Sequence, residues 1–169
     1  YNSATLAGGG IAVWQGVLNL SNSFITNNTA FAGAGIYILN KANCDVKVNS
    51  TIITNNISSH GSGVWLSNDS CLTIGDGTQI FDNTNIDEEM DNIEIVRGKI
   101  IIDETLINTK IGIHQTTISA YTTGYSAHNG NTDPNNYFFS DLSGEIVHLN
   151  SAGELEQAKT IASSKYDYI

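Results

Sequence analysis

Cysteine, proline and basic residues are scarce in this sequence. Two cysteines and one proline occur in 169 residues, and 7 basic residues stand against 17 acidic ones, giving a formal net charge of −10. Two cysteines are too few for a disulfide scaffold and lack the pairing of a zinc site. So acidic a chain is a poor partner for nucleic acid or an anionic membrane surface. No apolar run approaches the roughly 20 residues that cross a bilayer, so we expect no membrane insertion in this segment.

A Met start and a basic, apolar leader are also lacking, since the sequence begins at Tyr1, so targeting cannot be read from it directly. We therefore expect a processed product or a piece of a longer protein. Charged residues make up only 14%, whereas 20 residues are asparagine and 16 are glycine. Hydrophobic residues at 40% exclude wholesale disorder. The composition indicates a foldable chain with a polar, mostly uncharged surface.

A repeat of about 28 residues covers the first two thirds of the chain. Phe-Ile-Thr-Asn at 24–27 returns as Ile-Ile-Thr-Asn at 52–55 and as Ile-Phe-Asp-Asn at 80–83. A second apolar segment recurs in step at 10–14, 35–39, 63–67 and 92–96, and a third recurs at 18–20, 46–48, 72–74 and 100–102. Three short segments rich in β-branched residues, separated by Gly, Asn, Ser and Asp, indicate three strands and three corners in each unit.

Such units bury little alone but stack into a parallel β-helix, with equivalent side chains forming ladders along the axis. We predict an all-β, right-handed parallel β-helix of about four coils of 25–29 residues over 1–113. The predicted inward ladders are Phe24/Ile52/Ile80, Ile11/Ile36/Val64/Ile93, Val13/Ile38/Leu66/Ile95 and Leu20/Val48/Ile74. Asn27, Asn55 and Asn83 are predicted to form an amide ladder at a corner. Glycines before the first strand of each unit suit positive φ or close approach between coils. A two-sheet sandwich is the alternative, although it would not predict a fixed step.

The repeats resemble those of a known group of proteins. Ala-Gly-Gly-Gly-Ile at 7–11 and Gly-Ala-Gly-Ile-Tyr at 33–37, each followed by Phe- or Ile-x-x-Asn, are similar to the GGA-I and FxxN repeats of polymorphic outer-membrane proteins. They are also similar to repeats in β-helical adhesin-like surface proteins of bacteria and methanogenic archaea. Segments between 91 and 154 resemble a stretch that closes repeat arrays in large surface proteins of gut Firmicutes. The resemblance implies a secreted, cell-surface β-helix that functions in adhesion.

The repeat fades after Ile113, so residues 114–169 are predicted to be a polar, Tyr-rich cap over the last rung. Within this cap, 146–155 could form a hairpin, whereas 154–165 has moderate helical character, and the sequence does not choose between them. No cap precedes the first coil. We expect further coils of a parent protein at that edge.

Three aromatic residues form the candidate ligand-binding face. Tyr37 and Trp65 occupy equivalent outward positions on adjacent coils, and Trp14 lies one position along on the coil before. Flat aromatic side chains on a weakly charged face suit stacking on sugars or contact with a host or cell-surface protein. The alternative is that other segments simply pack over these rings.

Candidate metal and catalytic groups are fewer. The densest acidic run, with Asp87, Glu88, Glu89 and Asp91, offers hard oxygen ligands that could hold Ca²⁺, or is a solvated loop. An enzyme acting on polysaccharide is the alternative function, as a lyase or hydrolase. Arg97 is the sole arginine, however, and of the carboxylates only Asp69 with Asp76 or Asp45 suggests a pair. Four histidines share no common spacing. We therefore expect no catalytic site and no cofactor.

Cys44 and Cys71 are 27 residues apart, about one coil, and the strand alignment gives them opposite facing, which favours two separate thiols over a disulfide. Taken together, the sequence predicts a non-enzymatic extracellular surface module, a stalk or adhesin segment of a larger protein. A fibre-like or tailspike-like assembly segment is a further alternative.

Overall fold

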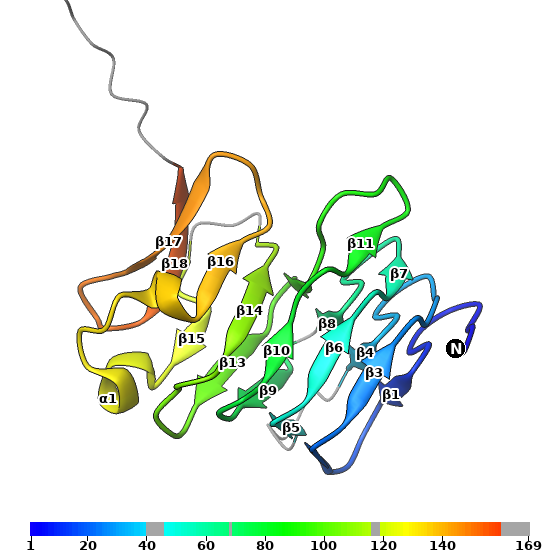
Figure 1. The fold of residues 1–169 in the computed structure, drawn as a ribbon, viewed down its shortest axis with the longest axis horizontal. Helices are drawn as coiled ribbons and strands as arrows, with labels where there is room; N and C mark the ends of the chain where they lie inside the picture. Colours follow the sequence, from blue (N-terminus) through cyan, green and yellow to red (C-terminus); the bar gives the residue numbers. More distant parts are fainter. Residues whose placement is uncertain (40–45, 68, 116–118, 160–169) are drawn as a thin grey trace, which may run out of the picture.

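The structure, a computed structural model, describes residues 1–39, 46–67, 69–115 and 119–159. These residues form a parallel β-helix of about four coils, as predicted (Figure 1). The first sheet consists of β1 (Ile11–Val13), β4 (Ile36–Ile38), β8 (Val64–Leu66) and β12 (Ile93–Ile95). The second sheet consists of β2 (Leu18–Ser21), β5 (Val46–Asn49), β9 (Cys71–Ile74), β13 (Lys99–Ile102) and β15 (Thr122–Thr123). The third sheet consists of β3 (Phe24–Thr26), β6 (Ile52–Thr54), β10 (Gln79–Ile80), β14 (Lys110–Ile113) and β16 (Phe138–Ser140). Two short strands, β7 (Ile57–Ser58) and β11 (Thr84–Asn85), pair between the third and first sheets.

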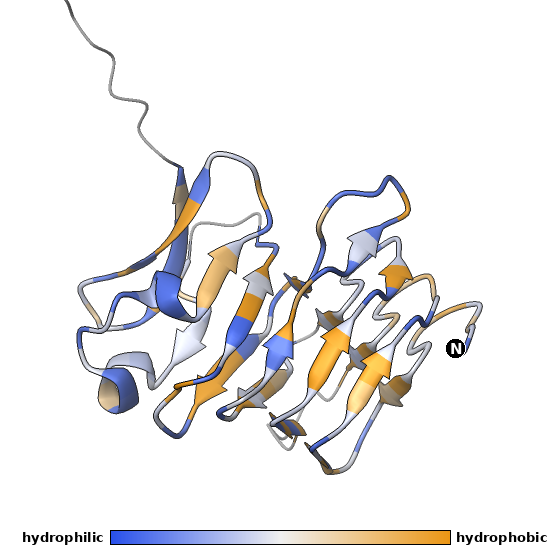
Figure 2. Cartoon of the chain, viewed as in Figure 1, coloured by the Kyte–Doolittle hydropathy of each residue, from blue (hydrophilic) through white to orange (hydrophobic). Residues whose placement is uncertain are grey.

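Three of the four predicted ladders are confirmed by the register of the strands. Successive strands of the first sheet align two ladders, and successive strands of the second sheet align one. Most members are fully buried, since alternate residues of each strand point into the stack. The apolar residues lie mainly in the strands, and the corners are mostly polar (Figure 2). The confirmed ladders are Ile11/Ile36/Val64/Ile93, Val13/Ile38/Leu66/Ile95 and Leu20/Val48/Ile74.

The fourth predicted ladder, Phe24/Ile52/Ile80, is wrong. Phe24 is 74% exposed and pairs with Ile52, but Ile52 pairs with Gln79 rather than with Ile80. The strand of the third coil arrives one residue earlier than a constant step of 28 requires. Because neighbouring residues point to opposite faces, this single residue inverts the assignment. The buried ladder is Ile25/Ile53/Ile80/Ile111.

The asparagine ladder exists, but in two coils it uses the neighbouring residue. Asn27 and Asn55 are exposed corner residues with φ of 58° and 55°, and only Asn83 of the predicted set is buried in the ladder. The observed ladder runs through Asn2, Asn28, Asn56, Asn83 and Asn92 to Asp141.

Each step of this ladder repeats one geometry. The backbone N–H and the side-chain Nδ2 of Asn28 both donate to Oδ1 of Asn56, at 3.0 and 2.9 Å. Asn56 donates to Asn83 at 3.1 and 2.8 Å, and Asn83 donates to Asn92 at 3.0 and 2.9 Å. The amides also donate to strand carbonyls, so the buried polar groups are satisfied.

Both predicted uses of glycine before the first sheet occur. Gly33 and Gly61 adopt φ of 58° and 55°, which a side chain would disfavour. Gly63 faces the next coil, where an added Cβ would overlap the carbonyl oxygen of Asn92 and lie 2.8 Å from Nδ2 of Asn83. Asn92 itself occupies the equivalent position of the fourth coil, and its side chain therefore fills the ladder from the first sheet.

Parallel pairing continues past Ile113, because β15 and β16 add to the second and third sheets. Between them lie α1 (Tyr125–Asn129) and the 3₁₀-helix η1 (Pro134–Asn136). The hairpin of β17 (Glu145–Leu149) and β18 (Leu155–Lys159) then closes this end, so the hairpin alternative is correct for these residues. Buried Gln157 ties it to the last rung, donating to Ile113 O at 3.0 Å. The expected capping segment is thus present, opposite the N-terminal coil (Figure 1).

Cys71, at the start of β9, is disulfide-bonded. The expectation of separate thiols is therefore wrong for Cys71. Cys44, the other cysteine of that expectation, lies outside the described residues.

Candidate functional site

The three predicted aromatic residues form one row on the outer face of the first sheet. Tyr37 and Trp65 are register partners on β4 and β8. Trp14 follows β1 directly and lies two positions beyond Ala12, the register partner of Tyr37, rather than the one position expected from the sequence. The ring centroids of Trp14 and Tyr37 are 5.1 Å apart, and those of Tyr37 and Trp65 are 4.8 Å apart. This spacing matches the separation of neighbouring strands, which places one ring on each coil. We call Trp14, Tyr37 and Trp65 the aromatic row.

The row is less open than the sequence suggested. Tyr37 is only 7% exposed because rings on both neighbouring coils cover it, and burial raises its pKa. Trp65 is half-buried, whereas Trp14 is 55% exposed. The expectation of an exposed stripe is therefore wrong for Tyr37. Trp14 presents the largest accessible ring, and Tyr37 holds the row together.

Glu94 continues the row on the fourth coil as the register partner of Trp65. Its Oε2 lies 3.5 Å from Nδ1 of His60. Burial raises the pKa of Glu94, and the nearby Asp91 carboxylate raises it further, against the opposing effect of His60 and His114. A carboxyl beside an aromatic ring can accept or donate hydrogen bonds to sugar hydroxyls.

Next to Glu94 lies a pair formed by buried Asp91 and partly buried His114. Asp91 is 2% exposed and accepts hydrogen bonds from the backbone N–H and hydroxyl of Ser62, at 3.2 and 3.1 Å. His114 Nδ1 lies 3.4 Å from Asp91 Oδ1, and neither atom has a hydrogen-bond partner among the described residues. The contact with the Asp91 carboxylate raises the pKa of His114, outweighing the effect of burial. Ser62 bonds to the aspartate rather than to the histidine, so the arrangement lacks the nucleophile–base contact of a catalytic triad.

Asp141 lies at the end of the asparagine ladder, close to this pair. It accepts from the backbone N–H and from Nδ2 of Asn92, each at 2.7 Å. Burial raises the pKa of Asp141 in spite of these two donors.

The acidic run does not assemble as a metal site. Asp87, Glu88 and Glu89 are exposed on the loop between β11 and β12, and Asn85 Oδ1 accepts from the backbone of Asp87 and Glu89. Asp91 points inward to Ser62 and His114 instead. In the described ranges, no group of three or more His, Cys, Asp or Glu residues is arranged to hold a metal ion.

The carboxylates considered for hydrolysis do not converge either. Asp69 precedes β9 and Asp76 follows it, so the strand separates them. Burial alone would raise the pKa of Asp76, but backbone donors at Asn108 and Ile107 outweigh it and lower the pKa. Asp76 is thereby identified as a corner-stabilising residue. Asp45 lies outside the described residues.

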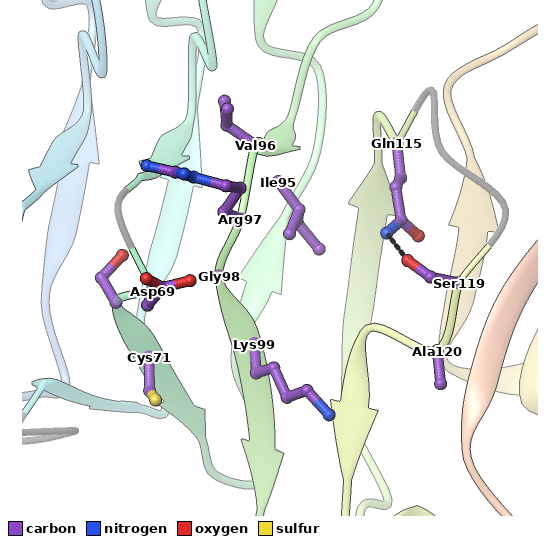
Figure 3. Close-up of a pocket in the computed structure, with 11 residues that line it drawn as sticks. Asp69, Cys71, Ile95, Val96, Arg97, Gly98, Lys99, Gln115, Ser119 and Ala120 are labelled. Atoms are coloured by element: carbon purple, nitrogen blue, oxygen red, sulfur yellow. Dashed lines mark hydrogen bonds between the residues drawn. The ribbon is translucent and has the colours of Figure 1, made fainter. Parts of the chain in front are cut away.

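A groove of about 730 Å³ opens at the corner between the first and second sheets. Its lining includes the connection from β12 to β13, with Arg97 and Lys99, together with Asp69 and Ser119 (Figure 3). Gln115 Nε2 donates to Ser119 Oγ at 3.3 Å across one side. Figure 3 shows Arg97 extending towards the Asp69 side and Lys99 towards Ala120.

Neither the groove nor the Asp91–His114 pair was found by sequence reasoning. Their residues come from different coils, and no repeat unit contains either set. The segment 84–92 sets the register of the fourth coil, and it is longer than the corresponding segment of the preceding units. The one feature of the sequence that marks the groove is that two basic residues, Arg97 and Lys99, lie two positions apart in a chain with few basic residues.

Comparisons with known proteins leave the chain without a family: no protein-family model, no curated protein and no solved structure matches it. Within the described residues, no helix has the length and apolar character that membrane crossing requires.

Proposed function

We propose that this chain is a non-enzymatic, extracellular surface module whose β-helix acts as a rigid stalk or adhesin segment and whose aromatic row binds glycans. The observation that carries the proposal is the row itself. Strand pairing holds Tyr37 and Trp65 in register, Trp14 contacts the Tyr37 ring from the neighbouring coil, and Trp14 offers an accessible ring at the end of the row. Stacking on a sugar needs such a flat ring fixed in advance.

Two further features support this proposal. The disulfide at Cys71 is typical of oxidising, extracytoplasmic environments. Glu94, next along the face, supplies the hydrogen-bonding group that usually accompanies an aromatic platform. The polysaccharide-lyase and hydrolase alternatives are weaker, because Asp69 and Asp76 sit at opposite ends of β9.

A glycan array with wild type and two single variants tests the proposal. Trp14→Ala removes the accessible ring, and we expect about tenfold weaker binding or more, since one ring stacking contributes on the order of 1.5 kcal/mol. Phe24→Ala is the matched control, because Phe24 is an exposed aromatic residue on the third sheet, away from the row. We expect its binding to equal that of wild type.

Four outcomes would contradict the proposal. Equal binding by all three proteins would place the contact elsewhere, and binding to none of the glycans would remove the ligand class. Release of reducing ends or unsaturated sugars from a bound polysaccharide would establish an enzyme. Sedimentation of wild type as long assemblies would favour the fibre-like alternative.

A further inference from the structure

The N-terminal coil carries no charged side chain. The first 40 residues contain no Asp, Glu, Lys, Arg or His, whereas all 7 basic and all 17 acidic residues of the chain follow them. Strands β1, β2 and β3 of this coil are edge strands of the three large sheets. Natural proteins usually protect such edges with charged residues or proline, and these three strands have neither. An uncharged edge of this kind is a template for pairing with a further strand.

Apolar surface is also exposed on this coil. Three of its inward residues, Ile11, Leu18 and Leu20, are only partly buried, although their register partners on the next coil are fully buried. The core is therefore uncovered at this end, where the described residues contain no further coil. Six large apolar side chains of the same coil are more than half exposed: Tyr1, Leu6, Trp14, Val17, Phe24 and Phe31. Removing this surface from water would favour docking of a segment that covers it.

The asparagine ladder shows which contacts such a segment would make. In the interior, Asn56 Nδ2 donates to Ile25 O of the coil before it at 3.0 Å, and Asn56 Oδ1 accepts from Asn28 of that coil. Asn83 repeats both contacts one coil later. Among the described residues, however, Asn28 Nδ2 donates only to Asn56, and no residue donates to Asn2 Oδ1. A segment that continues the ladder must offer a strand carbonyl to Asn28 and an N–H donor to Asn2.

A second copy of this chain does not meet these requirements. The hairpin of β17 and β18 closes its C-terminal end. Its N-terminal edge would bring Asn2 Oδ1 against the same acceptor atom of the partner. One more coil of this repeat meets both requirements, because a third strand followed by asparagine presents the carbonyl and the amide together. Ile25 and Asn28 present these two groups to the second coil in this way.

We propose that the edge formed by β1, β2 and β3 docks one more coil of this repeat, joined in the same polypeptide and paired in parallel. The asparagine of that coil donates to Asn2, and its third strand accepts from Asn28. This inference goes beyond the proposed function, because it does not depend on glycan binding. A coil that repeats Trp14 would lengthen the aromatic row by one ring.

A tandem chain tests the inference with the full protein present. A copy of residues 1–26 placed directly before Tyr1 puts the asparagine of the copy 26 residues before Asn2, which is the separation of Asn2 from Asn28. We expect the backbone amides of β1, β2 and β3 to exchange with deuterium at least about tenfold more slowly than in the chain of residues 1–169, because these strands become interior. The amides of β12 and β13 are the internal reference and should not change.

Two matched extensions control for added length and for the amide. A copy with the same residues in scrambled order should leave the exchange of β1, β2 and β3 at the wild-type rate. A copy that carries Asn2→Asp keeps the shape of the side chain but loses the Nδ2 donor, so it should lose most of the protection.

Equal exchange in the tandem chain and in the scrambled extension would overturn the inference. An Asn2→Asp copy that protects the three strands as well as the unaltered copy would refute recognition through asparagine. Sedimentation of the 1–169 chain as a dimer, with β1, β2 and β3 protected in that dimer, would identify a second copy as the occupant and refute the proposal. Each of these results is independent of the glycan array.

Discussion

The asparagine ladder shows at the scale of single residues what periodicity can and cannot assign. Asn27 and Asn28 both recur 28 residues later, as Asn55 and Asn56, so the period supports either member of each pair. The structure uses Asn28 and Asn56 for the buried ladder and places Asn27 and Asn55 in exposed left-handed corners. The third unit distinguishes the two positions, because Asp82 precedes Asn83 and aspartate can adopt the left-handed corner conformation but cannot replace the amide of the ladder. An identical amide thus acts through hydrogen bonds at one position and through backbone conformation at the next.

Substitution of neighbouring asparagines should separate these two roles. Asn56→Ala leaves two buried donors of Asn28, its backbone N–H and its Nδ2, without their acceptor, and Asn83 Oδ1 keeps only the backbone N–H of residue 56 as a donor. We therefore expect a loss of about 3 kcal/mol or more in the free energy of unfolding. Asn55→Gly keeps the positive φ and removes only an exposed side chain, and should change stability by about 1 kcal/mol or less. Urea unfolding measures both. Equal destabilisation of the two variants would show that the ladder contributes little.

At the scale of elements, the first two sheets were predictable and the third was only partly so. Each unit of the first sheet has two inward apolar residues separated by one outward residue, preceded by Gly in the first three units and by Asn92 in the fourth, and this pattern fixes its register. In the third sheet the first two residues of β3 and of β6 are both apolar, so the hydrophobic pattern does not reveal which of the two is buried. The step from Ile53 to Ile80 is 27 residues rather than 28, and only the strand pairing shows it. The candidate site was predictable where it lies on the first sheet, and not where it depends on the loop lengths at the corners.

The register of β3 can be tested by truncating its two apolar residues separately. Ile25→Ala removes a buried ladder side chain, and we expect a loss of about 2–4 kcal/mol. Phe24→Ala removes an exposed ring and should change stability by about 0.5 kcal/mol or less. Equilibrium unfolding in urea compares the two. A larger loss for Phe24→Ala would restore the ladder expected from the sequence and refute the observed pairing.

At the scale of the whole molecule, the titrating groups near the end of the ladder act in the same direction. Glu94 and Asp141 have pKa values raised chiefly by burial, and the pKa of His114 is raised by Asp91. A raised pKa means that the folded state binds the proton more tightly than the unfolded state. Each group therefore contributes stability at low pH that is lost as the pH rises through its folded pKa. Asp76 has a lowered pKa, so its contribution to stability is lost as the pH falls. This loss occurs only in more acidic solution, below the ordinary aspartate pKa.

The melting temperature, Tm, should therefore be highest in mildly acidic solution rather than at neutral pH. The contributions of Glu94 and Asp141 fade above their ordinary pKa values of 4.5 and 3.8, and that of His114 fades above 6.5. We expect Tm to fall between pH 5 and pH 8, and a negative net charge that grows with pH adds to the fall. His114→Gln should flatten the part of this slope above pH 6.5. A Tm that rises from pH 6 to pH 8 would contradict the assignment.

The direction of the asparagine ladder has a consequence for the length of such a solenoid. Every amide donates towards the C-terminal end, so the amide dipoles add along the axis, and the series stops at Asp141, which in its ionised form only accepts. A carboxylate cannot pass the pattern on to another asparagine, so it acts as a chemical terminator at that end. Duplicating an internal unit preserves both the polarity and the stop, because the new amide accepts from one neighbour and donates to the other. The ladder thus allows the solenoid to vary in length by whole coils while its final rung stays the same.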